Sequence, residues 1–139
     1  MSNADTATLQ MWRSSNAKNF YQGRWPRVLC VCSAGLLRSP TLAWVLSNEP
    51  YNCNVRAAGS HAEYALVPVD PVLLTWAQRV VFVNRENHAR VVESGLALPD
   101  EVYVLNVPDR YEFREDELVL AISKELENVG FPHYRKEAA

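Results

Sequence analysis

The sequence lacks several features that would place it outside the class of small globular proteins. No run of apolar residues approaches the roughly 18 needed to cross a bilayer, so no membrane span and no membrane partner are predicted. Glycine and proline are sparse, at 5 and 8 of 139 residues, which excludes collagen-like and linker-like chains. With 48% hydrophobic residues, the chain has enough apolar material for one compact domain.

Neither sign of charge dominates. The 14 basic and 16 acidic residues give a formal net charge of -2, so no general attraction to DNA, RNA or an anionic membrane is expected. Any site for an anion must therefore be local. Histidine is also scarce. The three histidines are scattered, and no carboxylates cluster beside them, so neither a metal nor another cofactor is predicted.

Cysteine is limited to Cys30, Cys32 and Cys53. An odd number, with two of the three separated by a single residue, fits neither a disulfide framework nor a C-x2-C metal pair, so free thiols are expected. The first 18 residues are polar and lack the apolar core of a secretory signal, and we expect a cytoplasmic protein.

Strand and helix patterns alternate along the rest of the chain. Short, continuous, valine-rich runs predict buried parallel strands at residues 27–32, 54–58, 79–84 and 101–106. Ser39-Pro40 and Asp70-Pro71 each place a capping side chain before a proline at the first helical position, which predicts two helix starts.

Two further helices complete the predicted fold. Residues 86–94 carry a Glu86/Arg90 pair at helical spacing and end at Gly95, and another helix ends at Gly130. The apolar face of this last helix is formed by Leu118, Ile122, Leu126 and Val129. The alternation predicts a three-layer α/β/α fold with a doubly wound, four-stranded parallel sheet, whose ligands bind at the carboxyl ends of the strands.

The loop after the first predicted strand carries the strongest chemical signal. Cys32 ends the strand, and the spacing C-x5-R-S-P brings Arg38 and Ser39 to a helix start. Six residues between strand and helix can wrap backbone N–H groups around a tetrahedral anion, and the same groups would stabilise a thiolate aimed at bound phosphorus. Arg38 would hold two oxygens, and Ser39 would assist the departure of the thiolate. The residues expected to bind the substrate are Ser33, Ala34, Gly35, Leu36 and Leu37.

This loop resembles the phosphate loop of the low-molecular-weight protein tyrosine phosphatases, which has the pattern V-C-x-G-N-x-C-R-S-P and also follows the first strand. Ala57-Ala58-Gly59-Ser60 is similar to the family's S-A-G-T, and residues 76–83 are similar to its A-D-x-I-x-x-M segment. The resemblance spans residues 26–128. It implies a phosphatase-like α/β domain over residues 25–139, preceded by a tail or short extension at residues 1–24.

Two positions depart from the family's loop. Gly35 stands where the family has an asparagine in a left-handed conformation, which glycine reaches without steric cost. The bracing supplied by the asparagine side chain is lost, so we expect a more mobile loop and a slower site. Leu37 replaces a second cysteine that in many family members traps the oxidised nucleophile, so peroxide is expected to drive Cys32 past the sulfenic state more readily.

A phosphomonoester leaving group needs a proton, so a carboxylic acid is expected across the pocket. The resemblance places this acid in the loop before the last helix, where Asp109 is the candidate and Glu112 the reserve. The order here is Pro-Asp, similar to a small bacterial branch of predicted tyrosine phosphatases with an I-P-D-x-Y-E-F loop. Tyr111 either stacks on an aryl phosphate or packs on the final helix. His61 and Tyr64 could form the other wall of the pocket, or belong to a solvated loop.

The sequence therefore predicts a cysteine-dependent protein tyrosine phosphatase that hydrolyses phosphotyrosine in a protein, or a small aryl phosphate, and releases inorganic phosphate. Its intermediate would be a thiophosphate on Cys32. Two alternatives remain. One is a phosphate- or phosphotyrosine-binding module with weak turnover. The other is an arsenate reductase, which would need resolving cysteines.

Overall fold

The computed structural model describes residues 25–33, 35, 38–63, 65–108 and 115–134. The predicted tail at residues 1–24 lies outside this part of the chain. The strands are β1 (Arg27–Cys32), β2 (Asn54–Gly59), β3 (Arg79–Phe82) and β4 (Glu101–Val104). The helices are α2 (Arg38–Leu46), α3 (Pro71–Trp76), α4 (Arg85–Glu93) and α5 (Asp116–Asn128).

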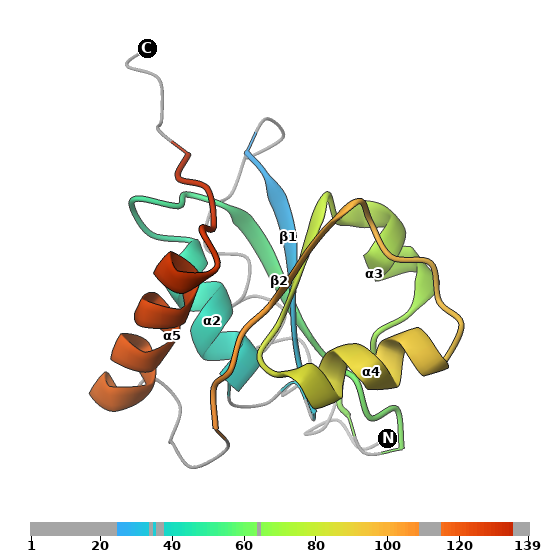
Figure 1. Ribbon diagram of the computed structural model, residues 1–139. Coiled ribbons are helices and arrows are strands. Elements are labelled where there is room, and N and C mark those ends of the chain that lie inside the picture. The colour runs from blue at the N-terminus through green and yellow to red at the C-terminus, as the bar shows by residue number, and fades with distance from the viewer. Residues whose placement is uncertain (1–24, 34, 36–37, 64, 109–114, 135–139) are drawn as a thin grey trace, which may run out of the picture.

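The four strands form one parallel sheet in the order β2-β1-β3-β4 (Figure 1). The predicted strands are confirmed, although β3 and β4 each end two residues earlier than expected. For β3 the reason is local. The side chain of Asn84 accepts a hydrogen bond from the backbone N–H of Asn87, so Asn84 caps α4 and the chain has already turned away from the sheet.

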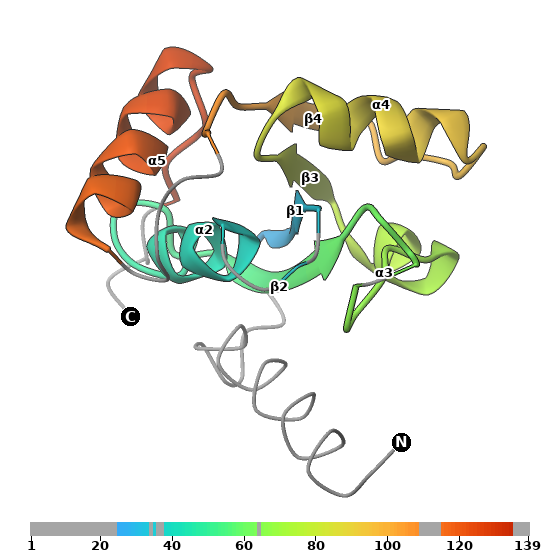
Figure 2. The ribbon, with the colours of Figure 1, turned by 90° about the horizontal axis from the view of Figure 1, so that it is seen from below.

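Helices cover both faces of the sheet. Seen from below, α2 and α5 lie on one face and α3 and α4 on the other (Figure 2). Each face has its own apolar core. The first is built around Leu42, Leu118, Ile122 and Leu126, and the second around Leu29, Leu74, Phe82 and Val91. Burial on both faces explains why the strands are continuous apolar runs, and it confirms the predicted three-layer α/β/α fold.

The two predicted helix starts differ in detail. Asp70 caps α3, and its carboxylate accepts a hydrogen bond from the N–H of Leu73 at 2.8 Å, with Pro71 in the first turn as expected. The first residue of α2 is Arg38, two residues before the predicted first helical position at Pro40. Ser39 is therefore inside the helix, and its hydroxyl is within hydrogen-bonding distance of Cys32 instead of capping the helix.

The last two helices follow the prediction closely, except for one ion pair. Leu118, Ile122 and Leu126 of α5 are fully buried, as the apolar face predicted. The prediction that Glu86 and Arg90 pair with each other on α4 is wrong. Arg90 instead pairs with Glu63 at 2.6 Å, because the loop after β2 brings that carboxylate to α4.

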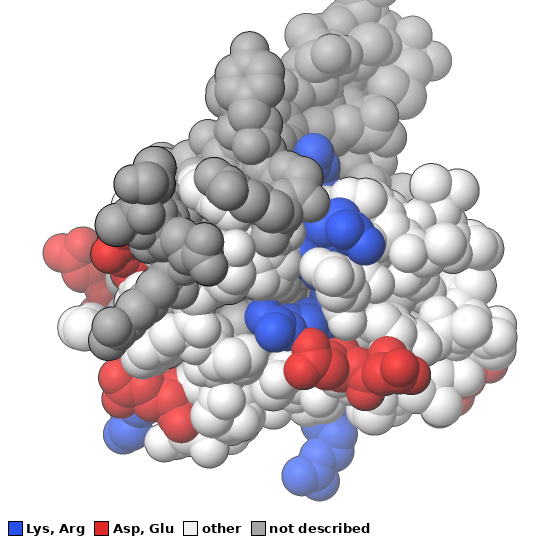
Figure 3. All heavy atoms as spheres, turned by 90° about the horizontal axis from the view of Figure 1, so that it is seen from above, with Lys and Arg blue, Asp and Glu red and all other residues white. Residues whose placement is uncertain are grey.

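The two ends of the sheet differ in their chemistry. The amino ends of the strands face the viewer in Figure 3, where basic and acidic side chains adjoin. Arg79 and Glu101, the first residues of β3 and β4, form an ion pair at this end. The carboxyl ends of the strands carry Cys32 and the loop that follows it. In the described ranges, no helix is both long enough and apolar enough to cross a membrane.

Candidate active site

Cys32 is the last residue of β1, at the carboxyl edge of the sheet and beside Gly59 of β2. Its side chain is only 3% exposed. The Sγ atom lies 3.1 Å from the hydroxyl of Ser39 and accepts a hydrogen bond from the N–H of Gly35 at 3.2 Å. The Ser39 hydroxyl also donates to the carbonyl of Ala58 at 3.4 Å. The Cys32 thiol donates to the oxygen of Ser39, and the N–H of Gly35 is the backbone donor that faces the sulfur.

Gly35 crosses the loop with a left-handed backbone, at φ +77°. A Cβ atom at this position would lie 2.9 Å from the carbonyl carbon of Ala58 and 2.9 Å from the nitrogen of Gly59. These are backbone atoms of β2, which cannot move aside as a flexible side chain could. Glycine is therefore needed here for close approach as well as for its backbone angle.

Arg38 opens α2 and is almost completely buried, at 3% exposed. Its Nη1 atom donates to the carbonyl of Val107 at 3.0 Å. Val107 follows β4, so this bond joins the loop after β1 to the segment that leads into the predicted acid loop. A buried arginine at the start of the helix that also carries Ser39 supplies positive charge at the carboxyl edge of the sheet.

The prediction from sequence missed two residues that brace the loop. Asn87 of α4 is fully buried, and its Nδ2 atom donates to Ser33 at 3.1 Å and to Ser60 at 3.0 Å. Within the described residues, the Asn87 Oδ1 atom is a buried polar atom without a hydrogen bond. Ser60 could have been found from the sequence, because it is the last residue of the segment that resembles S-A-G-T. An asparagine inside a polar helix gives no such signal.

Backbone hydrogen bonds join the two loops directly. The N–H of Ser60 donates to the carbonyl of Cys32 at 2.7 Å, and the N–H of His61 donates to that of Ser33 at 3.0 Å. The ring of His61 lies 3.0 Å from the Ser60 hydroxyl through Nδ1 and 3.8 Å from Glu86 through Nε2. The bracing expected from an asparagine in the loop is thus supplied from outside it, by Asn87 and Ser60.

The structure brings Cys32, Ser33, Gly35, Arg38 and Ser39 together. His61, a candidate for the pocket wall, lies beside Ser60. The other predicted site residues lie outside the described part of the chain, namely Ala34, Leu36, Leu37, Tyr64, Asp109, Tyr111 and Glu112. The chain leaves the described region at Pro108, one residue after the carbonyl that binds Arg38.

All three cysteines are free, and two of them are unsuited to ionise. Burial raises the pKa of Cys30 well above its ordinary value, with further contributions from the charges of Cys53 and Cys32. Burial likewise raises the pKa of Cys53 to about 12. Both therefore remain neutral thiols near pH 7. No cluster of three potential metal ligands occurs among the residues that the structure describes.

Comparisons with known proteins support the fold. No protein-family model matches the chain, and no curated protein sequence matches it. Among solved structures, the fold is similar to that of Vibrio vulnificus Wzb in complex with benzylphosphonate, with a TM-score of 0.56 and 16% sequence identity. The similarity covers 76% of this chain and 95% of Wzb. The chain therefore shares the α/β fold of Wzb, with its four-stranded parallel sheet between helices.

Proposed function

We propose that this protein is a cysteine-dependent phosphatase acting on phosphotyrosine or a similar aryl phosphate. The observation that carries the proposal is the environment of the Cys32 sulfur, which accepts the N–H of Gly35 and lies beside the Ser39 hydroxyl, with Arg38 opening the helix behind it. The C-x5-R-S-P spacing of the loop and the fold shared with Wzb also support the proposal.

In the first step, the Cys32 thiolate attacks phosphorus. An S–P bond forms as the bond from phosphorus to the aryl oxygen breaks, and the electron pair of that bond leaves with the aryl oxygen. Arg38 and the loop amides stabilise the charge on the three equatorial oxygens. The Ser39 hydroxyl, which here donates to Ala58, can rotate toward the sulfur and stabilise the thiolate before attack and after its release.

We assign the proton transfers to Asp109. Its carboxylic acid gives a proton to the departing aryl oxygen, and its carboxylate then takes one from water. That water attacks phosphorus, breaks the S–P bond and releases inorganic phosphate together with the Cys32 thiolate. The hydrogen bond from Arg38 to Val107 anchors the segment before this acid to the phosphate loop. None of these steps calls for a cofactor.

Arsenate reduction is less well supported by the geometry. It needs further cysteines that can form a disulfide as the product leaves. Cys30 and Cys53 are fully buried thiols whose raised pKa values keep the reactive thiolate scarce.

The test is release of p-nitrophenol from p-nitrophenyl phosphate across about pH 5 to 8, in the presence of a thiol reductant. The intact protein is compared with Cys32→Ser, with Asp109→Asn and with the matched cysteine control Cys53→Ala. We expect no turnover in the first variant, a drop of about 100-fold in the second, and retained activity in the control.

Activity in Cys32→Ser equal to that of the intact protein would exclude the proposed nucleophile. A reduced intact protein that binds inorganic phosphate but hydrolyses nothing would instead identify the alternative, a phosphate-binding module.

A further inference from the structure

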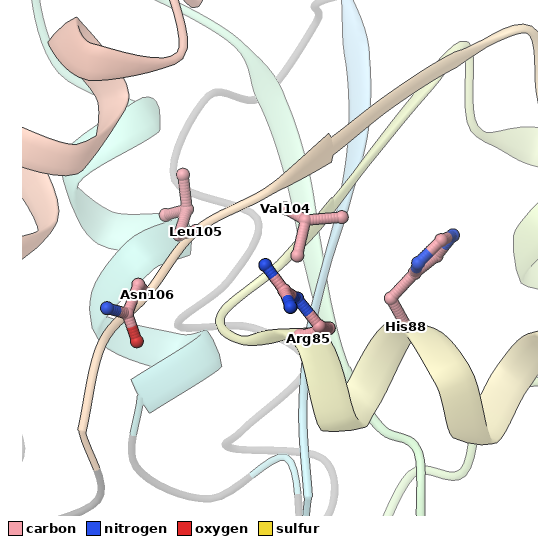
Figure 4. A pocket seen from close by; sticks show the side chains of 5 residues that line it. All are labelled: Arg85, His88, Val104, Leu105 and Asn106. Carbon is pink, nitrogen blue, oxygen red and sulfur yellow. The ribbon is translucent and has the colours of Figure 1, made fainter.

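The carboxyl edge of the sheet carries a cavity that the proposed reaction does not use. Its volume is about 610 Å³, and it lies between the first turns of α4 and the end of β4 (Figure 4). Its lining residues in the described part of the chain are Arg85, His88, Val104, Leu105 and Asn106. The next residue, Val107, accepts the hydrogen bond from Arg38, so the cavity adjoins the phosphate loop. Open parallel sheets bind ligands at this edge.

Arg85 is the charged group of the cavity. Among the described residues it has no hydrogen-bonding or ion-pair partner. The other described arginines are all engaged, Arg27 by the carbonyl of Trp76, Arg38 by Val107, Arg56 by Asn54 and Val55, Arg79 by Glu101 and Arg90 by Glu63.

No carboxylate occurs among the described lining residues. Glu125 approaches from α5, but its two oxygens accept the backbone N–H of Asn106 and the side chain of Asn128. The Glu125 carboxylate is thus held by Asn106 and Asn128, and it forms no ion pair with Arg85.

The position of Arg85 in its helix does not explain why a positively charged residue stands there. Arg85 is the first residue of α4, and the positive end of a helix dipole disfavours an arginine there. Its side chain rises from α4 toward Val104 and Leu105, into the cavity (Figure 4). One turn later, His88 packs its ring against Phe82, with 5.1 Å between ring centroids, and forms part of the same wall.

We propose that this cavity binds an acidic side chain of the substrate, two or three residues from the phosphotyrosine. The inference rests on the proposed function and names its substrate class, an acidic phosphotyrosine peptide. A planar guanidinium suits bidentate contact with a carboxylate. The cavity and the phosphate loop are joined through α4, because Asn87, two residues after Arg85, donates to Ser33 of that loop. An extended peptide advances about 3.4 Å per residue, so two or three residues carry it about 7–10 Å from the phosphotyrosine.

The test uses two peptides that carry a non-hydrolysable phosphonate in place of phosphotyrosine. They differ only in having glutamate or glutamine at the second and third positions on either side. Titrated calorimetrically into the intact protein at low salt, the glutamate peptide is expected to bind about three- to fivefold more tightly. The preference should shrink as salt is added, and Arg85→Gln should abolish it.

Arg90→Gln is the matched control, because Arg90 lies on the same helix and carries the same charge but pairs with Glu63 outside the cavity. It should keep the preference. Equal affinity of the intact protein for both peptides, failure to bind either, or an equal loss of preference in both variants would overturn the proposal.

Measuring hydrolysis of p-nitrophenyl phosphate by the intact protein distinguishes a failure of the acidic subsite from a failure of the proposed phosphatase activity. If the protein hydrolyses it but shows no preference between the peptides, only the acidic subsite is wrong. If the preference is present without hydrolysis, the subsite stands and the proposed activity fails.

Discussion

Gly35 combines a left-handed backbone with contact against the backbone of β2, so a side chain is expected to open the phosphate loop. Gly35→Ala and Gly35→Asn should each lower kcat/KM for p-nitrophenyl phosphate by at least about tenfold, because the new Cβ meets Ala58 and Gly59 at 2.9 Å. Introducing the asparagine of the loops that this one resembles would thus harm this protein.

The matched control is Gly95→Ala. Gly95 has a similar φ of +80°, but a Cβ there meets nothing within 4 Å. It should cost about 1–2 kcal/mol of stability through backbone strain while leaving kcat/KM unchanged. Equal activity in Gly35→Ala and Gly95→Ala would show that the close approach to β2 is unimportant.

Asn87 is expected to couple α4 to the phosphate loop. Asn87→Ala removes the donor to Ser33 and Ser60, which should cost about 1–3 kcal/mol in urea unfolding and weaken inhibition by inorganic phosphate. Asn84→Ala is the control on the same helix, because it removes the cap of α4 but not the bridge. Both variants should lose stability, and only Asn87→Ala should lose phosphate affinity. Unchanged phosphate inhibition in Asn87→Ala would contradict the bracing role.

At the scale of residues, local sequence predicted the loop but not its supports. The placement of Cys32, Gly35 and Arg38 follows from a strand, a loop and a helix that are consecutive in the chain. Asn87 was missed because its contacts, Ser33 and Ser60, belong to other parts of the chain. Nothing in a polar helix pattern distinguishes a buried asparagine from a solvated one.

Among the elements, α3 depends most on its cap. It has six residues, and Leu74 is the one that is buried, so few other contacts hold it. Asp70→Ala should lower the free energy of unfolding by about 1 kcal/mol, whereas Asp70→Asn should have little effect, because asparagine also accepts the N–H of Leu73. Asp100→Ala, at an exposed position, is the control for loss of one negative charge. An equal effect of Asp70→Ala and Asp100→Ala in urea unfolding would exclude the cap.

Element types were predictable because both faces of the sheet are buried, which makes each strand a continuous apolar run. Element ends were less so. The start of α2 was misplaced because Ser39 uses its hydroxyl at Cys32, and the Glu86/Arg90 pair was wrong because Glu63 reaches Arg90 from another loop. In each case a tertiary contact overrides a local pattern.

At the scale of the whole molecule, the buried thiols predict a loss of stability in alkali. The pKa of Cys53 is raised to about 12 in the folded protein, so between about pH 9 and pH 12 the unfolded chain releases a proton that the folded protein keeps. The free energy of unfolding should therefore fall by about 1.4 kcal/mol per pH unit for this group, with Cys30 acting in the same direction.

Urea unfolding at several pH values above about 9 checks this slope. Cys53→Ala should be less stable near neutral pH but should show a shallower decline. Val55→Ala, a truncation at a neighbouring buried position of β2, should lose stability without any change of slope. Parallel curves for Cys53→Ala and the unmodified protein would exclude Cys53 as the source.

The hydrogen bonds at the carboxyl edge also determine when the site can form during synthesis and folding. Arg38 and Val107 are 69 residues apart, and Ser33 and Asn87 are 54 apart. In a nascent chain the proposed phosphate site therefore stays incomplete until residues beyond Val107 have left the ribosome. Contacts of such long range form slowly. The rate at which phosphate binding recovers during refolding should therefore report the last steps of sheet assembly.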